Sequence, residues 1–301
     1  MKRPPGRLPL PRIAKLDGTG LVDDRGRTMK TQALTLLCVL AAALSEARAD
    51  TPAPMDDGTD QLTLPKGRFV IDAFLEISLV SDAVFKPFSI SPDVWYGVTD
   101  DITVGLVHSA DGETGFIGGT GTTLCLSGSD DGCPNIYNNI GADIRYRLKE
   151  GTYALALDGG LFFQSFDPDV QLALKLGAAG RWHRDKIAVE AEPSLFFGLT
   201  NRDTDIGETS SVRTNGDFLL LPVTGLYAIT PKISAAVQLG LILPFQNTGD
   251  TWAIPLSFGV HYLATEKLNI FAAFSLTRLF GGSSADAFDG RSLTIGGSYA
   301  L

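Results

Sequence analysis

Apolar and polar side chains alternate along most of this chain, from Lys66 to its last residue. A period of two is typical of β-strands, because successive side chains point to opposite faces of a sheet. The clearest run has small or polar residues between apolar ones at Trp252, Ile254, Leu256, Phe258, Val260 and Tyr262. The pattern predicts twelve strands, at residues 67–80, 88–98, 102–109, 138–148, 152–165, 170–182, 187–200, 217–229, 233–246, 251–264, 267–280 and 291–301.

The connections between these segments alternate in length. Short turns at 99–101, 149–151, 183–186, 230–232 and 265–266 alternate with connections that are mostly longer, notably 110–137, 201–216 and 281–290. An even number of antiparallel strands, with short turns at one end and long loops at the other, is typical of outer-membrane barrels. The sequence therefore predicts an all-β fold, a single antiparallel up-and-down transmembrane β-barrel of about twelve strands, with ten or fourteen as alternatives.

The aromatic residues distinguish a membrane barrel from a soluble one, because a soluble barrel has no reason to collect them at one level. An aromatic belt is expected on the apolar face near the short turns and the C-terminus, made of Tyr96, Tyr146, Tyr153, Trp182, Tyr227, Tyr262 and Tyr299. Amphipathic rings at one depth are typical of a membrane–water interface. A weaker belt is expected at the other end, at Phe163, Phe197, Phe245, Trp252 and Phe280.

The last strand reads Leu293-Thr-Ile-Gly-Gly-Ser-Tyr-Ala-Leu301, with apolar residues at alternate positions from the end and Tyr299 third from last. It resembles the C-terminal sorting strand of Gram-negative outer-membrane β-barrel proteins. It departs from that pattern in ending on Leu301 rather than Phe, and in having Gly297 at an apolar position. The resemblance implies insertion by the barrel-assembly machinery and contact with outer-membrane lipid as partner.

The first 49 residues are expected to lie outside the barrel. Residues 29–49 begin with a short positive region at Lys30, followed by an apolar stretch and an Ala47-Arg48-Ala49 cleavage site, which together are typical of a cleaved signal peptide. Residues 1–28 are interpreted as a gene-model extension or a long basic leader. Residues 50–66 are expected to form a short periplasmic lead-in, and residues 67–301 the barrel.

Charge and cysteine content narrow the function classes. Residues 1–49 carry nine of the 25 basic and four of the 34 acidic residues, so their removal leaves a net charge of −14. Such a surface repels phosphate backbones, and nucleic-acid binding is therefore not expected. Cys125 and Cys133 bracket a turn-forming stretch and are candidates for a loop disulfide in an oxidising compartment, with two free thiols as the alternative.

If the apolar face meets lipid, the opposite face lines the barrel. The expected lumen charges are Asp72, Glu76, Asp93, Asp143, Arg145, Arg147, Asp158, Lys175, Arg181, Glu190 and Glu192. They favour either a constriction that selects solutes by charge or an ion-pair network that rigidifies and partly fills the barrel. In this register, Arg145 and Arg147 lie on the strand adjacent to Asp158, and Lys175 and Arg181 lie next to Glu190 and Glu192. In the same register, the inward aromatic residues are Phe74, Trp95, Phe162, Phe196, Phe218 and Phe271.

No catalytic motif, metal site or cofactor is expected. The three histidines, His108, His183 and His261, fall at different levels, and neighbouring His108 and Ser109 point to opposite faces. The leading hypothesis is a passive or weakly selective outer-membrane pore for small hydrophilic solutes. The alternatives are a non-conducting structural or surface-display barrel whose loop 110–137 contacts an unidentified surface partner and, third, a lipid-modifying enzyme.

Overall fold

The computed structural model describes residues 62–80, 86–117, 124–127, 133, 137, 139–166, 169–205, 211–213, 215–246, 248–282 and 290–301. The expected signal peptide, the segment before it and most of the lead-in lie outside these residues. Among the described residues, no helix has the length and apolar character needed to cross a membrane.

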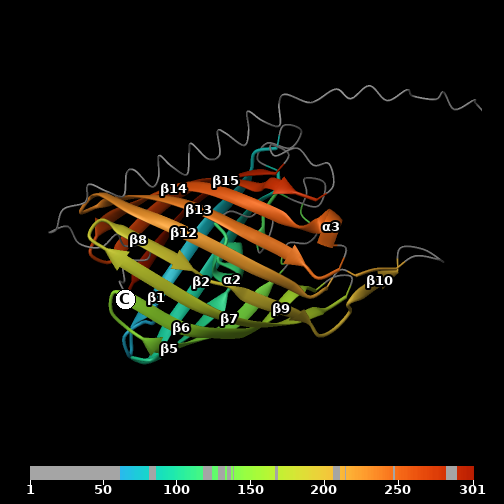
Figure 1. The fold of residues 1–301 in the computed structure, drawn as a ribbon, viewed down its shortest axis with the longest axis horizontal. Coiled ribbons are helices and arrows are strands. Elements are labelled where there is room, and N and C mark those ends of the chain that lie inside the picture. The colour runs from blue at the N-terminus through green and yellow to red at the C-terminus, as the bar shows by residue number, and fades with distance from the viewer. Residues whose placement is uncertain are drawn as a thin grey trace, which may run out of the picture. The chain divides into compact units, whose positions relative to one another are not determined.

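Long antiparallel strands make up almost all of the described chain (Figure 1). Their bounds are β1 Phe69–Ser78, β2 Phe88–Thr99, β3 Ile102–Val107, β5 Ile140–Lys149, β6 Tyr153–Ser165, β7 Gln171–Arg184, β8 Ile187–Ala191, β9 Ser194–Gly198, β12 Phe218–Thr230, β13 Ile233–Pro244, β14 Ala253–Thr265, β15 Leu268–Gly281 and β16 Arg291–Ala300. The shorter elements are α2 Ala110–Thr114, β4 Leu124–Cys125, β10 Asp203–Asp205, β11 Ser211–Arg213 and α3 Thr248–Thr251.

The sheet closes on itself, because β1 pairs with both β2 and β16. Each strand of the wall pairs antiparallel with the next, and β8 and β9 together occupy one position between β7 and β12. Counted this way, the described residues form a closed barrel of twelve strands, with β4 added at β2 and β10–β11 forming a separate pair. The predicted all-β fold and the strand number are confirmed.

The segment expected as one strand at 187–200 is interrupted at Glu192 and Pro193. Proline has no N–H to donate to a neighbouring strand, so it is usually found at bulges or edges. The carbonyl of Pro193 still accepts a hydrogen bond from the Ala178 N–H (3.0 Å), and the Glu192 N–H donates to the carbonyl of Pro222 (3.2 Å). The wall therefore stays closed at this interruption.

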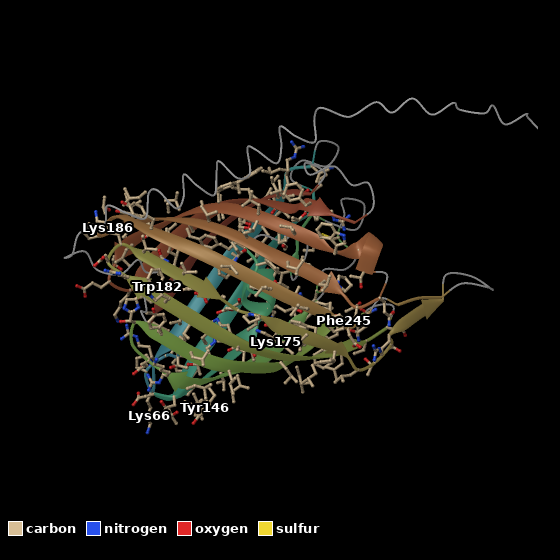
Figure 2. All side chains as sticks on the ribbon, viewed as in Figure 1. Lys66, Tyr146, Lys175, Trp182, Lys186 and Phe245 are labelled. Carbon is tan, nitrogen blue, oxygen red and sulfur yellow. A yellow bond between two sulfur atoms is a disulfide. The ribbon has the colours of Figure 1, made fainter. Side chains whose placement is uncertain are left out.

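The outer face of the barrel is apolar, and most of the residues expected in the aromatic belt are exposed on it. Tyr146, Tyr153, Tyr227, Tyr262 and Tyr299 are between 43% and 62% exposed, and Tyr153 lies directly opposite half-buried Trp182 on β7. Half-buried Tyr96 packs against Phe69, with ring centroids 4.4 Å apart and the ring planes tilted by 33°. Figure 2 shows Tyr146 and Trp182 at the end with the short turns, beside Lys66 and Lys186, and Phe245 toward the other end.

Two segments that were expected outside the barrel enter it. The connection after β3 turns inward, so that α2 lies inside the ring of strands (Figure 1). At the short-turn end, Thr63 and Leu64 of the lead-in are buried, and Leu64 packs on Val70 and Ala300. The Leu64 N–H donates to Thr103 Oγ1 (2.7 Å), which fastens this segment to the wall.

Candidate functional site

The inward turn of the chain begins at a buried carboxylate on β2. Asp93 Oδ1 accepts hydrogen bonds from the backbone N–H groups of His108 (2.6 Å) and Ser109 (2.9 Å), and Asp93 Oδ2 accepts one from the Ser109 hydroxyl. Ser109 is the N-cap of α2 and accepts from the Gly112 N–H (2.9 Å). These contacts direct the chain away from the wall as soon as β3 ends.

The far end of the same segment is fastened to the opposite wall. Gln238 on β13 accepts from the Ile117 N–H (2.7 Å) and donates to the Gly115 carbonyl (2.6 Å). The hydroxyls of Ser257 on β14 and Ser275 on β15 donate to the Ile117 carbonyl, at 3.0 and 2.9 Å. Residues 110–117, hereafter the crossing segment, therefore span the lumen from β3 to β13–β15.

An apolar core lies inside the barrel on one side of the crossing segment. Phe116 packs in a buried cluster with Phe162 and Phe196, and half-buried Phe218 stacks on Phe196 at 4.9 Å. Gly240 makes room for this core, because a Cβ there would lie 1.9 Å from the Phe116 ring. Part of the lumen is thus filled by side chains rather than by water.

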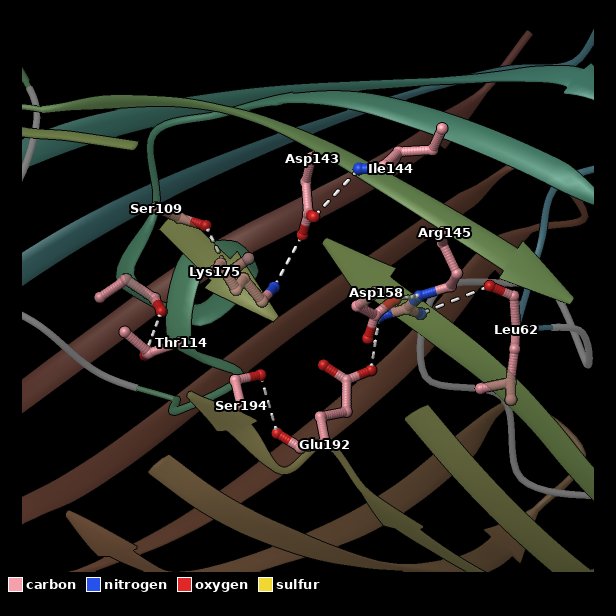
Figure 3. A network of polar contacts seen from close by, with 12 residues as sticks. Leu62, Ser109, Thr114, Asp143, Ile144, Arg145, Asp158, Lys175, Glu192 and Ser194 are labelled. Carbon is pink, nitrogen blue, oxygen red and sulfur yellow. Dashed lines mark hydrogen bonds and ion pairs between the residues drawn. The ribbon is translucent and has the colours of Figure 1, made fainter. Parts of the chain in front are cut away.

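Charged side chains on β5 and β7 form an ion pair across β6. Lys175 Nζ lies 2.7 Å from Asp143 Oδ2, and both residues are at least 96% buried. Gly160 lies between them in the register of the sheet, and a Cβ there would lie 2.9 Å from Asp143 Oδ1. The lysine was expected next to Glu190 and Glu192, but Figure 3 shows it in contact with Asp143. The missing side chain of Gly160 leaves room for this contact.

A second group of charges lies toward the short-turn end. Arg145 binds Asp158 (2.6 Å, Nε to Oδ1) as expected, and it also binds Glu192 (2.8 Å, Nη2 to Oε1) from β5 (Figure 3). Arg145 Nη1 additionally donates to the Leu62 carbonyl at 3.4 Å. Arg181 lies 3.0 Å from Glu190, and both side chains point inward.

The remaining charges of the predicted lining are spread along the wall. Arg147 lies at the short-turn end and binds Asp101 (2.7 Å) and Glu150, so it does not join Asp158. Asp72 lies directly opposite Asp93 in the register of β1 and β2. Glu76, nearer the long-loop end, accepts a hydrogen bond from the Ser89 hydroxyl (3.1 Å). The lumen therefore contains ion pairs of opposite charge as well as regions where carboxylates lie next to each other.

A cavity of about 200 Å³ lies between the crossing segment and the short-turn end. Among its described lining residues, five carry carboxylates and one carries a guanidinium: Asp72, Asp93, Asp111, Glu190, Glu192 and Arg145. An adjoining cavity of about 80 Å³, lined by residues 62–64, shares Asp72, Trp95 and Arg145 with it. We call the larger cavity the acidic chamber.

The crossing segment carries a buried carboxyl group that the sequence analysis did not identify. Glu113 on α2 is 7% exposed and accepts a hydrogen bond from Asn139 Nδ2 (3.0 Å). Burial is the largest cause that raises the pKa of Glu113; Lys175 and the Asn139 hydrogen bond lower it, and the carboxylates of Asp93 and Asp143 raise it. Together these effects bring the pKa to about 7. This group titrates close to neutral pH.

The described residues contain no cluster of three or more His, Cys, Asp or Glu side chains that could hold a metal ion. His108 Nδ1 contacts the Pro92 carbonyl and Nε2 contacts the Tyr137 hydroxyl (3.1 Å), while the Ser109 hydroxyl is bonded to Asp93. His183 lies on β7 near its turn, and His261 stacks on Phe271 at the chamber. The serine and histidine side chains are therefore engaged with different partners.

The alternation of apolar and polar residues predicts the inward face of the strands but not the crossing segment. Phe74, Phe162, Phe196 and Phe271 are all at least 93% buried, which matches the register inferred from the alternation. The signal that could have located the segment is the apolar pair Phe116-Ile117 within an otherwise polar, glycine-rich loop. Cys125 and Cys133 form a disulfide, with Cα atoms 5.6 Å apart.

Comparisons with known proteins identify the fold. No family model matches the sequence, and no curated protein matches it. Among solved structures, the KdgM porin aligns at 8% identity over 77% of this chain and 99% of its own, with a TM-score of 0.50, and the structure of the KdgM porin in complex with disordered oligogalacturonate gives the same values. An outer membrane channel from Pseudomonas putida F1 aligns at 16% identity over 82% of this chain and 100% of its own, with a TM-score of 0.49. In fold, this closed antiparallel β-barrel is similar to the barrel of the KdgM porin.

Proposed function

We propose that this protein is a passive pore of the outer membrane for small hydrophilic solutes. The support is a closed barrel whose outer face is apolar and carries an aromatic belt, while its interior holds charged groups around an acidic chamber. A lipid-facing exterior and a polar interior are the requirements of a water-filled route across a bilayer. Solutes then move down their gradients without chemical change.

The observation that carries the selectivity is the composition of the acidic chamber. Its described lining has five carboxylate residues and one arginine, and Arg145 is already paired with Asp158 and Glu192. A charged lining with low-dielectric walls concentrates ions of opposite sign and excludes those of like sign. The pore therefore prefers small cations over anions of similar size.

The test is the reversal potential of the purified protein in a planar bilayer across a potassium chloride gradient. Cation preference is expected in the wild type and is reduced by Asp72→Asn, because Asp72 lines both cavities. Glu266→Gln is the matched control, since Glu266 is exposed in the turn between β14 and β15. Anion preference, or equal effects of the two substitutions, would contradict the proposal.

A second candidate function is a non-conducting structural barrel. The observation that favours it is the filling of the lumen by the Phe116 core and by buried ion pairs. This candidate predicts that folded protein stays silent in the bilayer even after the crossing segment has been loosened. Its loop partner would then have to be sought at the long-loop end, around the Cys125–Cys133 disulfide.

The same proposal includes a route to the membrane. Export through cleavage after Ala49 would leave Asp50 as the first residue, and the last strand would be read by the barrel-assembly machinery. N-terminal sequencing of the protein from isolated outer membranes tests this, with Asp50 as the expected first residue. Recovery of the protein with Met1 intact would refute cleavage at this site.

A further inference from the structure

The crossing segment places one apolar side chain where the lumen is narrowed by two aromatic rings. Ile117 packs with Phe74 of β1 and Phe271 of β15 in a buried cluster, in which the two rings meet edge to face at 5.4 Å. Ile117 and Phe74 also line the acidic chamber, so this cluster forms part of the chamber's boundary. Gly296 admits both rings, because a Cβ there would lie 2.5 Å from Phe74 and 2.9 Å from Phe271.

Beyond this cluster, toward the long-loop end, the inner wall is rich in hydroxyl groups. Seven buried side chains on β1, β2, β14, β15 and β16 carry these groups, and we refer to them together as the hydroxyl wall: Ser78, Ser89, Ser91, Ser257, Ser275, Ser292 and Thr294. Within the described part of the chain, Ser292 Oγ and Thr294 Oγ1 are buried and have no hydrogen-bond partner. Buried hydroxyls without partners are unfavourable, and water in the lumen would satisfy them.

The contacts of Ile117 are suited to holding a movable closure. Its backbone is held by the side chains of Gln238, Ser257 and Ser275, which water can replace as hydrogen-bond partners. Its side chain packs with the two rings, and a short apolar constriction of this kind blocks ions by dewetting. A small outward shift of this residue would join the acidic chamber to the hydroxyl wall.

We propose that Ile117, Phe74 and Phe271 form a hydrophobic gate, and that hydrated small cations pass from the acidic chamber along the hydroxyl wall when it opens. This inference rests on the proposed pore function and names Ile117 as the residue that limits the conductance of the pore. Phe116 and its core keep the other side of the lumen closed, so the route follows β14, β15, β16, β1 and β2.

The test compares single-channel conductance of Ile117→Ala with that of the wild type, using protein purified from membranes. The gate predicts a severalfold larger conductance or open probability, because the truncated side chain leaves space for water between the rings. Phe271→Ala removes the gate from the strand side and should act in the same direction. Ile270→Ala is the matched control, since Ile270 precedes Phe271 on β15 but is exposed on the outer face of the barrel, away from the gate.

The outcomes separate the gate from the pore. A conducting wild type whose currents are unchanged in Ile117→Ala and Phe271→Ala overturns the gate and leaves the pore intact. Silence of the wild type and of both variants, with folding shown by heat-modifiable gel mobility, overturns both. A second experiment tests the route. The double variant Ser292→Cys, Ile117→Ala should lose cation current when its cysteine is modified by a positively charged methanethiosulfonate reagent. An unchanged current would show that the route does not follow the hydroxyl wall.

Discussion

The buried carboxyl group of Glu113 makes docking of the crossing segment depend on pH. Its pKa is about 7 in the barrel, against the ordinary value of 4.5 for a glutamate side chain. Since the docked segment holds the proton more tightly than the released one, its stability falls as the pH rises from about 4.5 to about 7 and is constant above that. Because of the difference between the two pKa values, docking of the crossing segment is less stable than at low pH by about 3 kcal/mol at pH 8.5, and by less than about 1 kcal/mol at pH 5.

Glu113→Gln removes the charge and keeps an oxygen that can accept the hydrogen bond from Asn139. The variant should therefore unfold at higher urea concentration than the wild type at pH 8.5, and at nearly the same concentration at pH 5, in detergent micelles. Asp111→Asn on the same helix is the control, because Asp111 opens onto the acidic chamber. A difference between wild type and Glu113→Gln that does not change between the two pH values would refute the reasoning.

Three further predictions concern the filling of the lumen. Lys175→Met should destabilise the barrel by about 3–5 kcal/mol, because it leaves the buried carboxylate of Asp143 without its partner; adding Asp143→Leu should restore much of the loss in urea unfolding, and a further loss would contradict this. Replacing Lys175 and Arg181 by Glu should lower stability with little change in ion selectivity, since both side chains are buried in ion pairs. Altered reversal potentials in folded protein would contradict this and show that the two side chains face the path of the ions. Phe116→Ala should cost about 3–5 kcal/mol in unfolding free energy and raise conductance, because it leaves a cavity in the core that docks the crossing segment; a variant as stable and as conductive as the wild type would mean that the core does not hold the segment.

The strands and their inward faces were predictable because both depend on local alternation. The segment expected at 217–229 is β12 at Phe218–Thr230, and the one expected at 267–280 is β15 at Leu268–Gly281. Burying one face of a strand determines which residues point inward, so Lys175 and Arg181 could be assigned to the lumen without knowing their partners. Pairing was predictable where charges face each other on adjacent strands, as for Arg145 with Asp158 and Arg181 with Glu190.

The crossing segment could not be predicted, because it is held by residues far away in sequence. The Ile117 backbone binds Gln238, Ser257 and Ser275, which lie 121, 140 and 158 positions away. Each of these is an ordinary inward-facing polar residue when read within its own strand. The pair between Lys175 and Asp143 was missed for a related reason, since it depends on the missing side chain of Gly160 on the strand between them.

The central claim, that small solutes cross the bilayer through this lumen, is tested most directly by flux into liposomes. Proteoliposomes of purified folded protein should admit a small amino-alcohol cation faster than a carboxylate anion of similar size. Both rates should rise in proportion to the gradient without saturating, as diffusion requires. Liposomes that admit neither solute, with protein shown to be folded and inserted, would contradict the account and point instead to a closed structural barrel.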